Sequence, residues 1–351
     1  MTPPRTRASN GRAVTLSDVA REAGVSLATA SRAINGSSDR SVRADLQERV
    51  LEAAARLSYS PDANAQAMAR GKTTILGLIV HEIADPYFSS IAAGVTQAAE
   101  KSGLAVTLAN THHDATRELE FVQTLQNLRA RAIILAGGRQ DDEAANEMLR
   151  RSLEAYQHNG GTVAMIGQPI LGVNAVQVDN VGGSAALAAA LHAQGYRRFA
   201  ILGGPRAHLT ARERIVGFRD ELARLGVEIS DADVVESGFT RDGGYDGMQA
   251  LLAANTGAEV VFAVNDVMAV GAMAAARDAG LRLPQDLAIA GFDDIPTLRD
   301  ITPALTTVGI PLEEMGRAAT ALALADPSQA PELVTIAGEV LIRESTPGPA
   351  S

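Results

Sequence analysis

The residues with the most specific potential chemistry lie on one side of a predicted helix that begins after Ser26. At 100° per residue they fall within one arc of about 140°, and they are Leu27, Ala28, Ser31, Arg32 and Asn35. Such an arc suits base edges in a DNA major groove, because arginine can bond guanine and short apolar groups can touch a thymine methyl. Taken alone, the segment could also be a solvated helical hairpin without a ligand.

Two short helices around a tight turn would position that arc. Thr15 and Asp18 have the spacing of a capping box, and Gly24 supplies the left-handed residue that ends the first helix. Ser26 caps the second helix, whose opposite arc is small and apolar. A third helix is predicted over 44–57, where apolar residues recur at helical spacing. The three helices predict a helix-turn-helix module.

The distribution of charge fits this interpretation. The formal net charge is −10, but residues 1–73 hold 11 Lys and Arg against 7 Asp and Glu, a balance of +4, which leaves 20 against 34, or −14, for the remainder. Attraction to phosphate is confined to within about 8 Å of a charge at physiological salt. A basic head can therefore bind DNA while an acidic body stays away from it.

Composition argues against several other classes of protein. The chain has no cysteine, so it forms neither disulfides nor thiolate metal sites. Its six histidines include the pair His112 and His113, which we interpret as part of a solvated turn, and we predict no metal. No apolar run approaches the roughly 18 residues of a membrane span, and residues 1–12 lack the apolar centre of a signal peptide. We expect a soluble, cytoplasmic protein with no cofactor and no membrane partner.

Beyond Thr73 the sequence alternates between short apolar runs and helical patterns. The predicted strands are 75–80, 105–109, 132–135, 163–166, 176–178, 199–202, 260–264 and 287–290. Near-continuous apolar runs indicate strands buried on both faces of mostly parallel sheets. Because so many units exceed one sheet, we expect two α/β subdomains with a ligand cleft between them, at the carboxyl ends of the strands.

Polar residues follow several of these strands. They are Asp85, Asp179, Asn180, Asn265, Asp266, Asp293 and Asp294. Each could simply cap the next helix, whereas together they could bind a hydroxyl-rich solute. The sequence contains no G-x-G-x-x-G after the first strand, no P-loop and no G-x-S-x-G or H-E-x-x-H motif, so no enzyme class is indicated.

In the order and type of its motifs, the chain resembles the lactose/galactose repressor (LacI/GalR) family of bacterial transcription regulators over residues 14–345. Residues 14–20 and 24–32 are highly specific for that family, and further matches follow in order at 59–62, 75–80, 85–88, 214–218, 264–266, 291–294 and 302–307. The resemblance implies an all-α helix-turn-helix headpiece followed by an α/β core of two subdomains, like the periplasmic binding proteins, with Rossmann-like parallel sheets.

The resemblance also implies which residues contact operator DNA. Leu27, Ala28 and Arg32 would read bases, and the positions expected at or near phosphates are Thr15, Ser26, Thr29, Ser31 and Asn35. Residues 61–70 match the family's hinge helix, which orders on the operator and enters the minor groove as a symmetric pair. Within it, Asn64, Ala65 and Gln66 would lie against the groove. Met68 stands where the family usually has a leucine wedge between bases, although it could instead pack on the body.

For the cleft, the resemblance implies that Arg214 binds the effector, which suits a guanidinium able to hold two oxygens at once. The other implied effector residues are Tyr87, Phe88, Phe239, Asn265 and Asp293. Gly167 and Gln168 replace the acidic and basic pair of many sugar-responsive relatives, so no particular sugar is carried over. No apolar heptads follow the last predicted strand, so we expect a dimer without a tetramerising coiled coil.

These observations predict the organisation of the chain. The expected segments are a tail (1–13), the DNA-binding domain (14–60), the hinge (61–72), the effector-binding and dimerisation core (73–345) and a second tail (346–351). Within the core, we assign 73–174 and 304–328 to the N-subdomain and 175–303 and 329–345 to the C-subdomain.

The expected function is that of a transcriptional repressor which binds a pseudo-palindromic operator as a homodimer. A sugar or sugar derivative in the cleft would control its affinity, with a purine, nucleoside or other non-sugar effector as the alternative. A transport-type solute-binding protein is disfavoured by the basic head and the missing signal peptide. An enzyme is disfavoured because no nucleophile is paired with a base.

Overall fold

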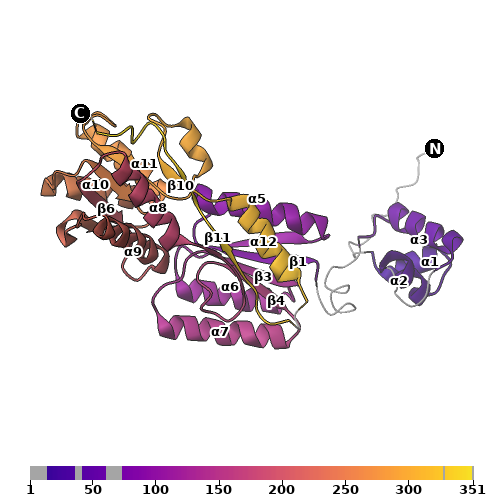
Figure 1. The fold of residues 1–351 in the computed structure, drawn as a ribbon. Coiled ribbons are helices and arrows are strands. Elements are labelled where there is room, and N and C mark those ends of the chain that lie inside the picture. Colours follow the sequence, from indigo (N-terminus) through magenta and orange to yellow (C-terminus); the bar gives the residue numbers. More distant parts are fainter. Residues whose placement is uncertain (1–13, 36–41, 61–72, 327–328, 350–351) are drawn as a thin grey trace, which may run out of the picture. The chain divides into compact units, whose positions relative to one another are not determined.

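The computed structural model describes residues 14–35, 42–60, 73–326 and 329–349 (Figure 1). The chain divides into two compact units, residues 1–73 and 74–351, which we call the head and the body. Among the described residues, no helix combines the length and the apolar character needed to cross a bilayer. The predicted hinge contacts Asn64, Ala65, Gln66 and Met68 lie outside the described residues.

In its described segments, 14–35 and 42–60, the head contains helices α1 (Leu16–Glu22), α2 (Leu27–Asn35) and α3 (Ala44–Arg56). Apolar side chains of all three form its core, among them Val19, Ala20, Ala30, Ala33, Val50 and Ala53. The predicted turn is confirmed: Gly24 has a φ of 63°, a conformation that favours glycine. The predicted cap is also confirmed, because Ser26 Oγ accepts a 3.1 Å hydrogen bond from the Thr29 amide.

The first lobe of the body is a doubly wound sheet. Its strands are β1 (Ile75–Val80), β2 (Ala105–Asn110), β3 (Ala132–Ala136), β4 (Thr162–Ile166), β5 (Asn174–Val178) and β11 (Leu333–Ile336). They pair in parallel in the order β2-β1-β3-β4-β5-β11. Helices α5 (Pro86–Lys101) and α12 (Leu312–Leu324) cover one face, and α6 (Ala115–Asn127) and α7 (Glu143–His158) cover the other (Figure 1).

The second lobe repeats this plan on a smaller scale. Strands β6 (Phe199–Gly203), β7 (Val234–Glu236), β8 (Val260–Ala263) and β9 (Ala288–Ala290) pair in parallel in the order β7-β6-β8-β9. Helix α8 (Asn180–Ala193) packs on α9 (Leu209–Arg224), and α10 (Arg241–Ala254) packs on α11 (Asp266–Asp278). The remaining elements are the short helices η1 (Asp231–Asp233) and η2 (Pro296–Asp300) and the antiparallel pair β10 (Thr307–Gly309) and β12 (Glu339–Leu341).

Strand pairing places the three crossings between the lobes differently from the sequence analysis. Strand β5 pairs with β4 and β11, so the first crossing follows Val178 rather than residue 174. Bridges from Ala290 to Thr306 and from Asp293 to Gly309 hold β10 in the second lobe, and the second crossing lies between β10 and α12. The third lies between β11 and β12. Strand β11 belongs to the first lobe because its backbone pairs with the edge that β5 would otherwise expose.

Candidate ligand cleft and DNA-binding helix

Helix α2 presents the predicted base-reading residues at the surface of the head. Leu27 is 51% exposed, and Ala28 beside it is also exposed. Arg32 lies one turn further along, where its Nε donates a 3.0 Å hydrogen bond to the Ala28 carbonyl. This bond holds the guanidinium stem on the same side of α2 as Leu27 and Ala28. The geometry therefore brings the three predicted base-reading residues together.

The residues predicted near phosphates lie at the starts of α1 and α2 and further along α2. Ser26 is exposed, and its Oγ lies 2.8 Å from the Thr29 Oγ1. Ser31 is half-buried on α2. Thr15 donates both its amide and its hydroxyl to the Asp18 carboxylate, at 3.0 and 2.7 Å, so it completes the predicted capping box. Asn35 is the last residue of α2, and its side chain is outside the described part of the chain.

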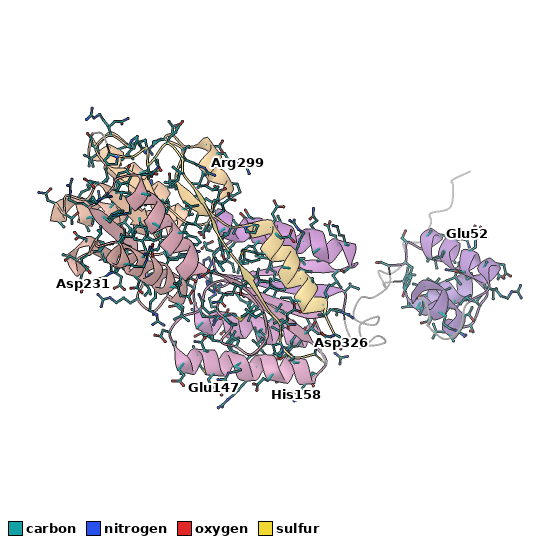
Figure 2. The ribbon with its side chains drawn as sticks, viewed as in Figure 1. Glu52, Glu147, His158, Asp231, Arg299 and Asp326 are labelled. Carbon is teal, nitrogen blue, oxygen red and sulfur yellow. The ribbon has the colours of Figure 1, made fainter. Side chains whose placement is uncertain are left out.

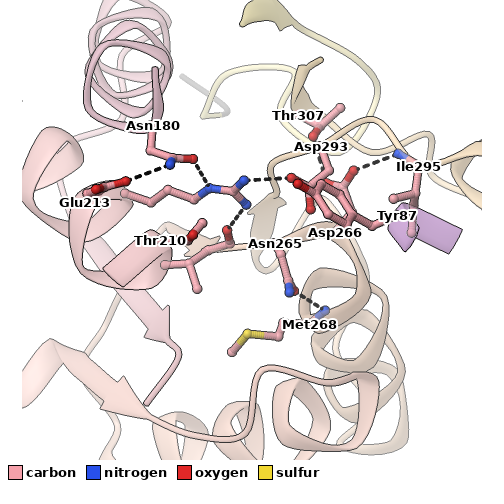
Figure 3. Close-up of polar contacts among 12 residues, drawn as sticks. Tyr87, Asn180, Thr210, Glu213, Asn265, Asp266, Met268, Asp293, Ile295 and Thr307 are labelled. Atoms are coloured by element: carbon pink, nitrogen blue, oxygen red, sulfur yellow. Dashed lines mark hydrogen bonds and ion pairs between the residues drawn. The ribbon is translucent and has the colours of Figure 1, made fainter. Parts of the chain in front are cut away.

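Arg214 on α9 lines the cleft in the body. Figure 3 labels two of its hydrogen-bond partners, Asn180 and Asp293. The Arg214 side chain is 2% exposed. The guanidinium donates from Nε to Asn180 Oδ1 at 2.9 Å, from Nη1 to the Val264 carbonyl at 2.7 Å and from Nη2 to Asp293 Oδ1 at 2.8 Å. It also lies 3.8 Å from the centre of the Phe292 ring. A buried cation held by three acceptors and a ring face has a fixed orientation, which suits recognition of a polar ligand.

Carboxyl and amide groups at strand ends both cap helices and line the cleft. Asn265 accepts a 2.9 Å hydrogen bond from the Met268 amide at the start of α11. Asp85 accepts a 2.9 Å bond from the Tyr87 amide at the start of α5. Burial raises the pKa of Asp85 to about 7, and burial likewise raises the pKa of Asp293 to about 7 although Arg214 opposes the rise. Asn265 and Asp85 therefore both cap a helix and line the cleft, as the two interpretations of the sequence had proposed separately.

All of the predicted effector residues line one small cavity of about 30 Å³ between the lobes. They are Tyr87, Phe88, Arg214, Phe239, Asn265 and Asp293. Phe88 and Phe239 also line an adjoining cavity of about 360 Å³. Ligand pockets usually enclose about 300 to 1,000 Å³, so we expect the inner cavity to widen, by movement of the lobes, when it takes up a sugar.

Direct hydrogen bonds hold the two lobes in this closed arrangement. Gln168, which follows β4 in the first lobe, donates to Thr210 Oγ1 at 3.0 Å and to Glu213 Oε2 at 2.9 Å on α9 of the second. Asp141 accepts a 2.7 Å ion-pair contact from Arg212 across the same gap. The sequence analysis noted Gln168 only as a departure from relatives, because nothing in its spacing shows that it faces α9.

A second buried arginine supports the cleft from the first lobe. Arg139 donates from Nη1 and Nη2 to the two oxygens of Glu118 at 2.8 and 2.9 Å, and both side chains are about 5% exposed. The Arg139 amide donates a 2.8 Å bond to Gln168 Oε1. This pair therefore fixes the loop after β3 against the residue that bridges the lobes. Sequence analysis did not identify either member, since they are 21 residues apart.

Asp266 gives a prediction for the stability of the body. The side chain is fully buried, and it accepts hydrogen bonds from Thr307 Oγ1 at 2.7 Å and the Ile295 amide at 3.1 Å. Burial raises its pKa from 3.8 to about 6, so the folded state keeps a proton that the unfolded chain releases. The stability linked to this group is present below pH 4 and is lost as the pH rises to about 6.

We therefore expect the unfolding free energy of Asp266→Asn in urea to rise by roughly 2 kcal/mol relative to that of the parent protein between pH 4 and pH 7, whatever its absolute value. The control is Asp246→Asn on the exposed side of α10. Its unfolding free energy should differ from that of the parent protein by the same amount at every pH. A constant difference between Asp266→Asn and the parent across this range would contradict the shifted titration.

Comparison with known proteins identifies related chains. Residues 15–62 match the description "Bacterial regulatory proteins, lacI family", and residues 188–346 match "Periplasmic binding protein-like domain". The ribose operon repressor of Haemophilus influenzae is 34% identical over 305 residues, which are 87% of this chain and 89% of that repressor. The solved complex of the transcriptional regulator CelR with cellobiose has a TM-score of 0.69 and 28% identity and covers 95% of this chain and 99% of CelR.

The Lac repressor dimer bound to operator and the anti-inducer ONPF shares the fold. Its TM-score is 0.81 at 24% identity, over 95% of this chain and 99% of that one. The predicted fold class, a helix-turn-helix headpiece with a parallel-sheet α/β core, is confirmed by these matches.

Proposed function

The chain belongs to the lacI family of bacterial regulatory proteins, which makes it a DNA-binding transcriptional regulator, and we propose that it represses transcription under control of a ligand in the cleft of its body. One observation supports the ligand part above all others. Aromatic and polar residues of both lobes, predicted from separate parts of the sequence, line a single cavity around Arg214. One relative, the ribose operon repressor of Haemophilus influenzae, is named as a repressor, and this makes repression the first activity to test.

The proposed effector is a sugar or a sugar derivative. The cavity lining offers donors and acceptors from Arg214, Asn265 and Asp293, which suit hydroxyl groups. Tyr87, Phe88 and Phe239 offer ring faces for the apolar side of a pyranose or furanose. The ribose operon repressor and the CelR–cellobiose complex make sugars the first ligands to test. A purine or nucleoside is the second candidate, because the same ring faces can stack on a base.

The proposed switch is a change in the angle between the lobes. In the closed arrangement, Gln168 and Asp141 bond directly to α9. A ligand that enters the inner cavity must separate these contacts and replace them with its own. It can change operator affinity only through a difference in its affinity for the two arrangements, and a coupling of about 1 to 3 kcal/mol would change operator affinity 5- to 150-fold.

The proposed assembly is a homodimer on a pseudo-palindromic operator. One helix of the size of α2 contacts only a half-site, so two heads related by two-fold symmetry are needed to read a full operator. The Lac repressor, which has this fold, is a dimer on its operator. The segment around Met68 would enter the minor groove as a pair and open a base step. We further propose that the protein acts in the cytoplasm and lies on the nucleoid when bound to its operator.

Two simple experiments would distinguish the proposed regulator from a solute-binding protein and from an enzyme. A solute-binding protein would keep its whole activity after deletion of residues 1–72, whereas the proposed regulator would lose operator binding. An enzyme would convert the bound ligand into a product, whereas the regulator would release it unchanged. The net balance of +4 in residues 1–73 favours the regulator.

Arg32→Ala gives a direct test of the proposed base contact. We expect it to lose about 1 to 3 kcal/mol of discrimination between the operator and random DNA, a 5- to 150-fold loss, because the guanidinium would no longer bond guanine. The operator is first selected from a random DNA pool with the parent protein, and both affinities are then measured at one salt concentration.

Arg56→Ala is the matched control, because it removes the same charge from an exposed position on α3 where the side chain pairs with Glu22 and Glu52. It should weaken binding to both DNAs equally or not at all. Full discrimination by Arg32→Ala would exclude the proposed base contact.

A further inference from the structure

Three histidines from separate parts of the body meet in the cleft. His81 follows β1, His113 lies in the loop after β2, and His208 caps the start of α9 in the other lobe. One ring nitrogen of each lies within 4.8 Å of one ring nitrogen of each of the others. The ring centres of His81 and His113 are 4.7 Å apart, and those of His113 and His208 are 6.3 Å apart. The sequence analysis considered only the neighbours His112 and His113. It missed the cluster because positions 81, 113 and 208 lie too far apart in the sequence to match a metal-binding motif.

Two of the three rings lack partners for a buried nitrogen. His81 and His208 are 6% and 3% exposed, and the Nδ1 atom of each is buried without a hydrogen-bond partner among the described residues. An unsatisfied buried polar atom costs about 1 to 3 kcal/mol, so its retention calls for an explanation. Burial lowers the pKa of His81 and lowers the pKa of His208 to about 3, which keeps both rings neutral with a lone pair available for a ligand.

Two consecutive glycines make room for these rings. A Cβ atom at Gly137 would lie 2.5 Å from His81 Nδ1, and a Cβ at Gly138 would lie 2.8 Å from His208 Cε1. Gly137 also has a φ of 143°, outside the range that other residues adopt readily. The loop after β3 therefore has no side chains where it passes the two buried imidazoles.

Charges of both signs surround the three rings. Arg139 and Arg214 lie nearby, but each is already paired, with Glu118 and Asp293 respectively. The carboxyl groups of Glu82 and Asp85 line the adjoining cavity together with His113. His112 is exposed, and its Nδ1 lies 3.0 Å from Glu82 Oε2. Of the two neighbouring histidines, His113 therefore faces the cleft and His112 faces the surface.

We propose that His81, His113 and His208 bind a divalent transition metal, with zinc as the best match to three neutral imidazoles, and that its fourth position faces the cavity beside Arg214 and Asp293. Zinc–nitrogen bonds of about 2.0 to 2.1 Å would need the ring nitrogens to approach one another by up to about 1.5 Å. His113 can move because it is half-buried and lies in a loop. The fourth position would take an oxygen of a hydroxyl or carboxylate ligand. That last step rests on the proposed function, whereas the metal site itself does not.

The test is a titration of the metal-free, full-length protein with Co²⁺, whose visible absorption becomes intense in a four-coordinate site. We expect one Co²⁺ per protomer, displaced by Zn²⁺. The double variant His81→Gln/His208→Gln should bind Co²⁺ at least about tenfold more weakly. The variant His208→Phe should also lose the absorption, while keeping the ring that stacks on Phe239 at 4.5 Å between ring centres. The control is His158→Gln at the exposed end of α7, which should bind Co²⁺ as the parent protein does (Figure 2).

Circular dichroism at the temperature of the titration confirms that each variant is folded. Octahedral cobalt absorption in the parent protein, or equal Co²⁺ affinity in folded His208→Phe and parent protein, would overturn the proposed site. Because this titration uses no DNA, its failure leaves the operator proposal untouched, and a failure to bind any operator leaves the metal proposal untouched.

Discussion

Arg214→Met is expected to lower the free energy of unfolding of the body by about 3 to 5 kcal/mol and to abolish the response to ligand. The substitution keeps much of the volume over the Phe292 ring, but it removes the donors to Asn180, Val264 and Asp293. The Asp293 carboxyl, 5% exposed, then has no cation beside it. In this variant, the Asp293 carboxyl avoids an unpaired buried charge only if it stays protonated.

This requirement gives the loss a definite pH dependence. In the parent protein the pKa of Asp293 is raised by burial to about 7, and the variant lacks the guanidinium that opposes the rise. Below pH 7 the carboxyl is protonated in both folded proteins, so the difference in unfolding free energy is smallest there. Above pH 7 the parent protein ionises while the variant does not, and the loss should grow with pH.

Two further variants make the result interpretable. Arg214→Met/Asp293→Asn should recover part of the lost stability, because no charge is left unpaired. Arg219→Met on the same helix is the matched control, since that side chain is 36% exposed and pairs with Asp231, which is 92% exposed. It should change the unfolding free energy by no more than about 1 kcal/mol. An Arg214→Met protein as stable as Arg219→Met at pH 8 would contradict the role assigned to the buried pair.

Arg139→Met is expected to have the second large effect, a loss of about 3 to 5 kcal/mol in urea unfolding. It breaks a two-bond contact with Glu118 and leaves that carboxylate buried. In the double variant Arg139→Met/Glu118→Leu, both charges are replaced by apolar groups of similar size, and the loss should be largely reversed. The pair of Arg224, which is 68% exposed, and half-buried Glu221 provides the comparison, and Arg224→Met should lose less than about 1 kcal/mol.

The outcome of the double variant separates two explanations. If Arg139 acts through its charge, the single variant is much less stable than the double variant. A double variant that is no more stable than Arg139→Met would show that the arginine stem, rather than the ion pair, stabilises the first lobe.

The fold was predictable from the sequence where local chemistry decides structure. Gly24 and Ser26 fix the turn and cap of the head, and long apolar runs such as Ile75–Val80 identify the strands buried on both faces. Strands β7, β10, β11 and β12 were not predicted because each has only three or four residues, and β7, β11 and β12 also have partly exposed patterns. Their place is decided by pairing with distant strands, which no local pattern records.

Some residues of the candidate site were likewise predicted from the sequence, and others were missed. Tyr87, Phe88, Arg214, Phe239, Asn265 and Asp293 were found through the resemblance, and the structure brings them to one cavity, although their role in binding stays a prediction. Gln168, Glu118 with Arg139, and the three histidines were missed. Each depends on contact between residues that are 21 or more positions apart, and no motif spans such a distance.

The central claim is that a small molecule in the cleft changes the affinity of the head for its operator. The direct measurement is fluorescence anisotropy of the selected operator with the parent protein, repeated with each member of a panel of sugars, sugar phosphates, nucleosides and purines. We predict a 5- to 150-fold change with at least one member, no change in Arg214→Met, and the parental response in Arg219→Met. An operator affinity that stays constant across the whole panel in the parent protein would contradict the account.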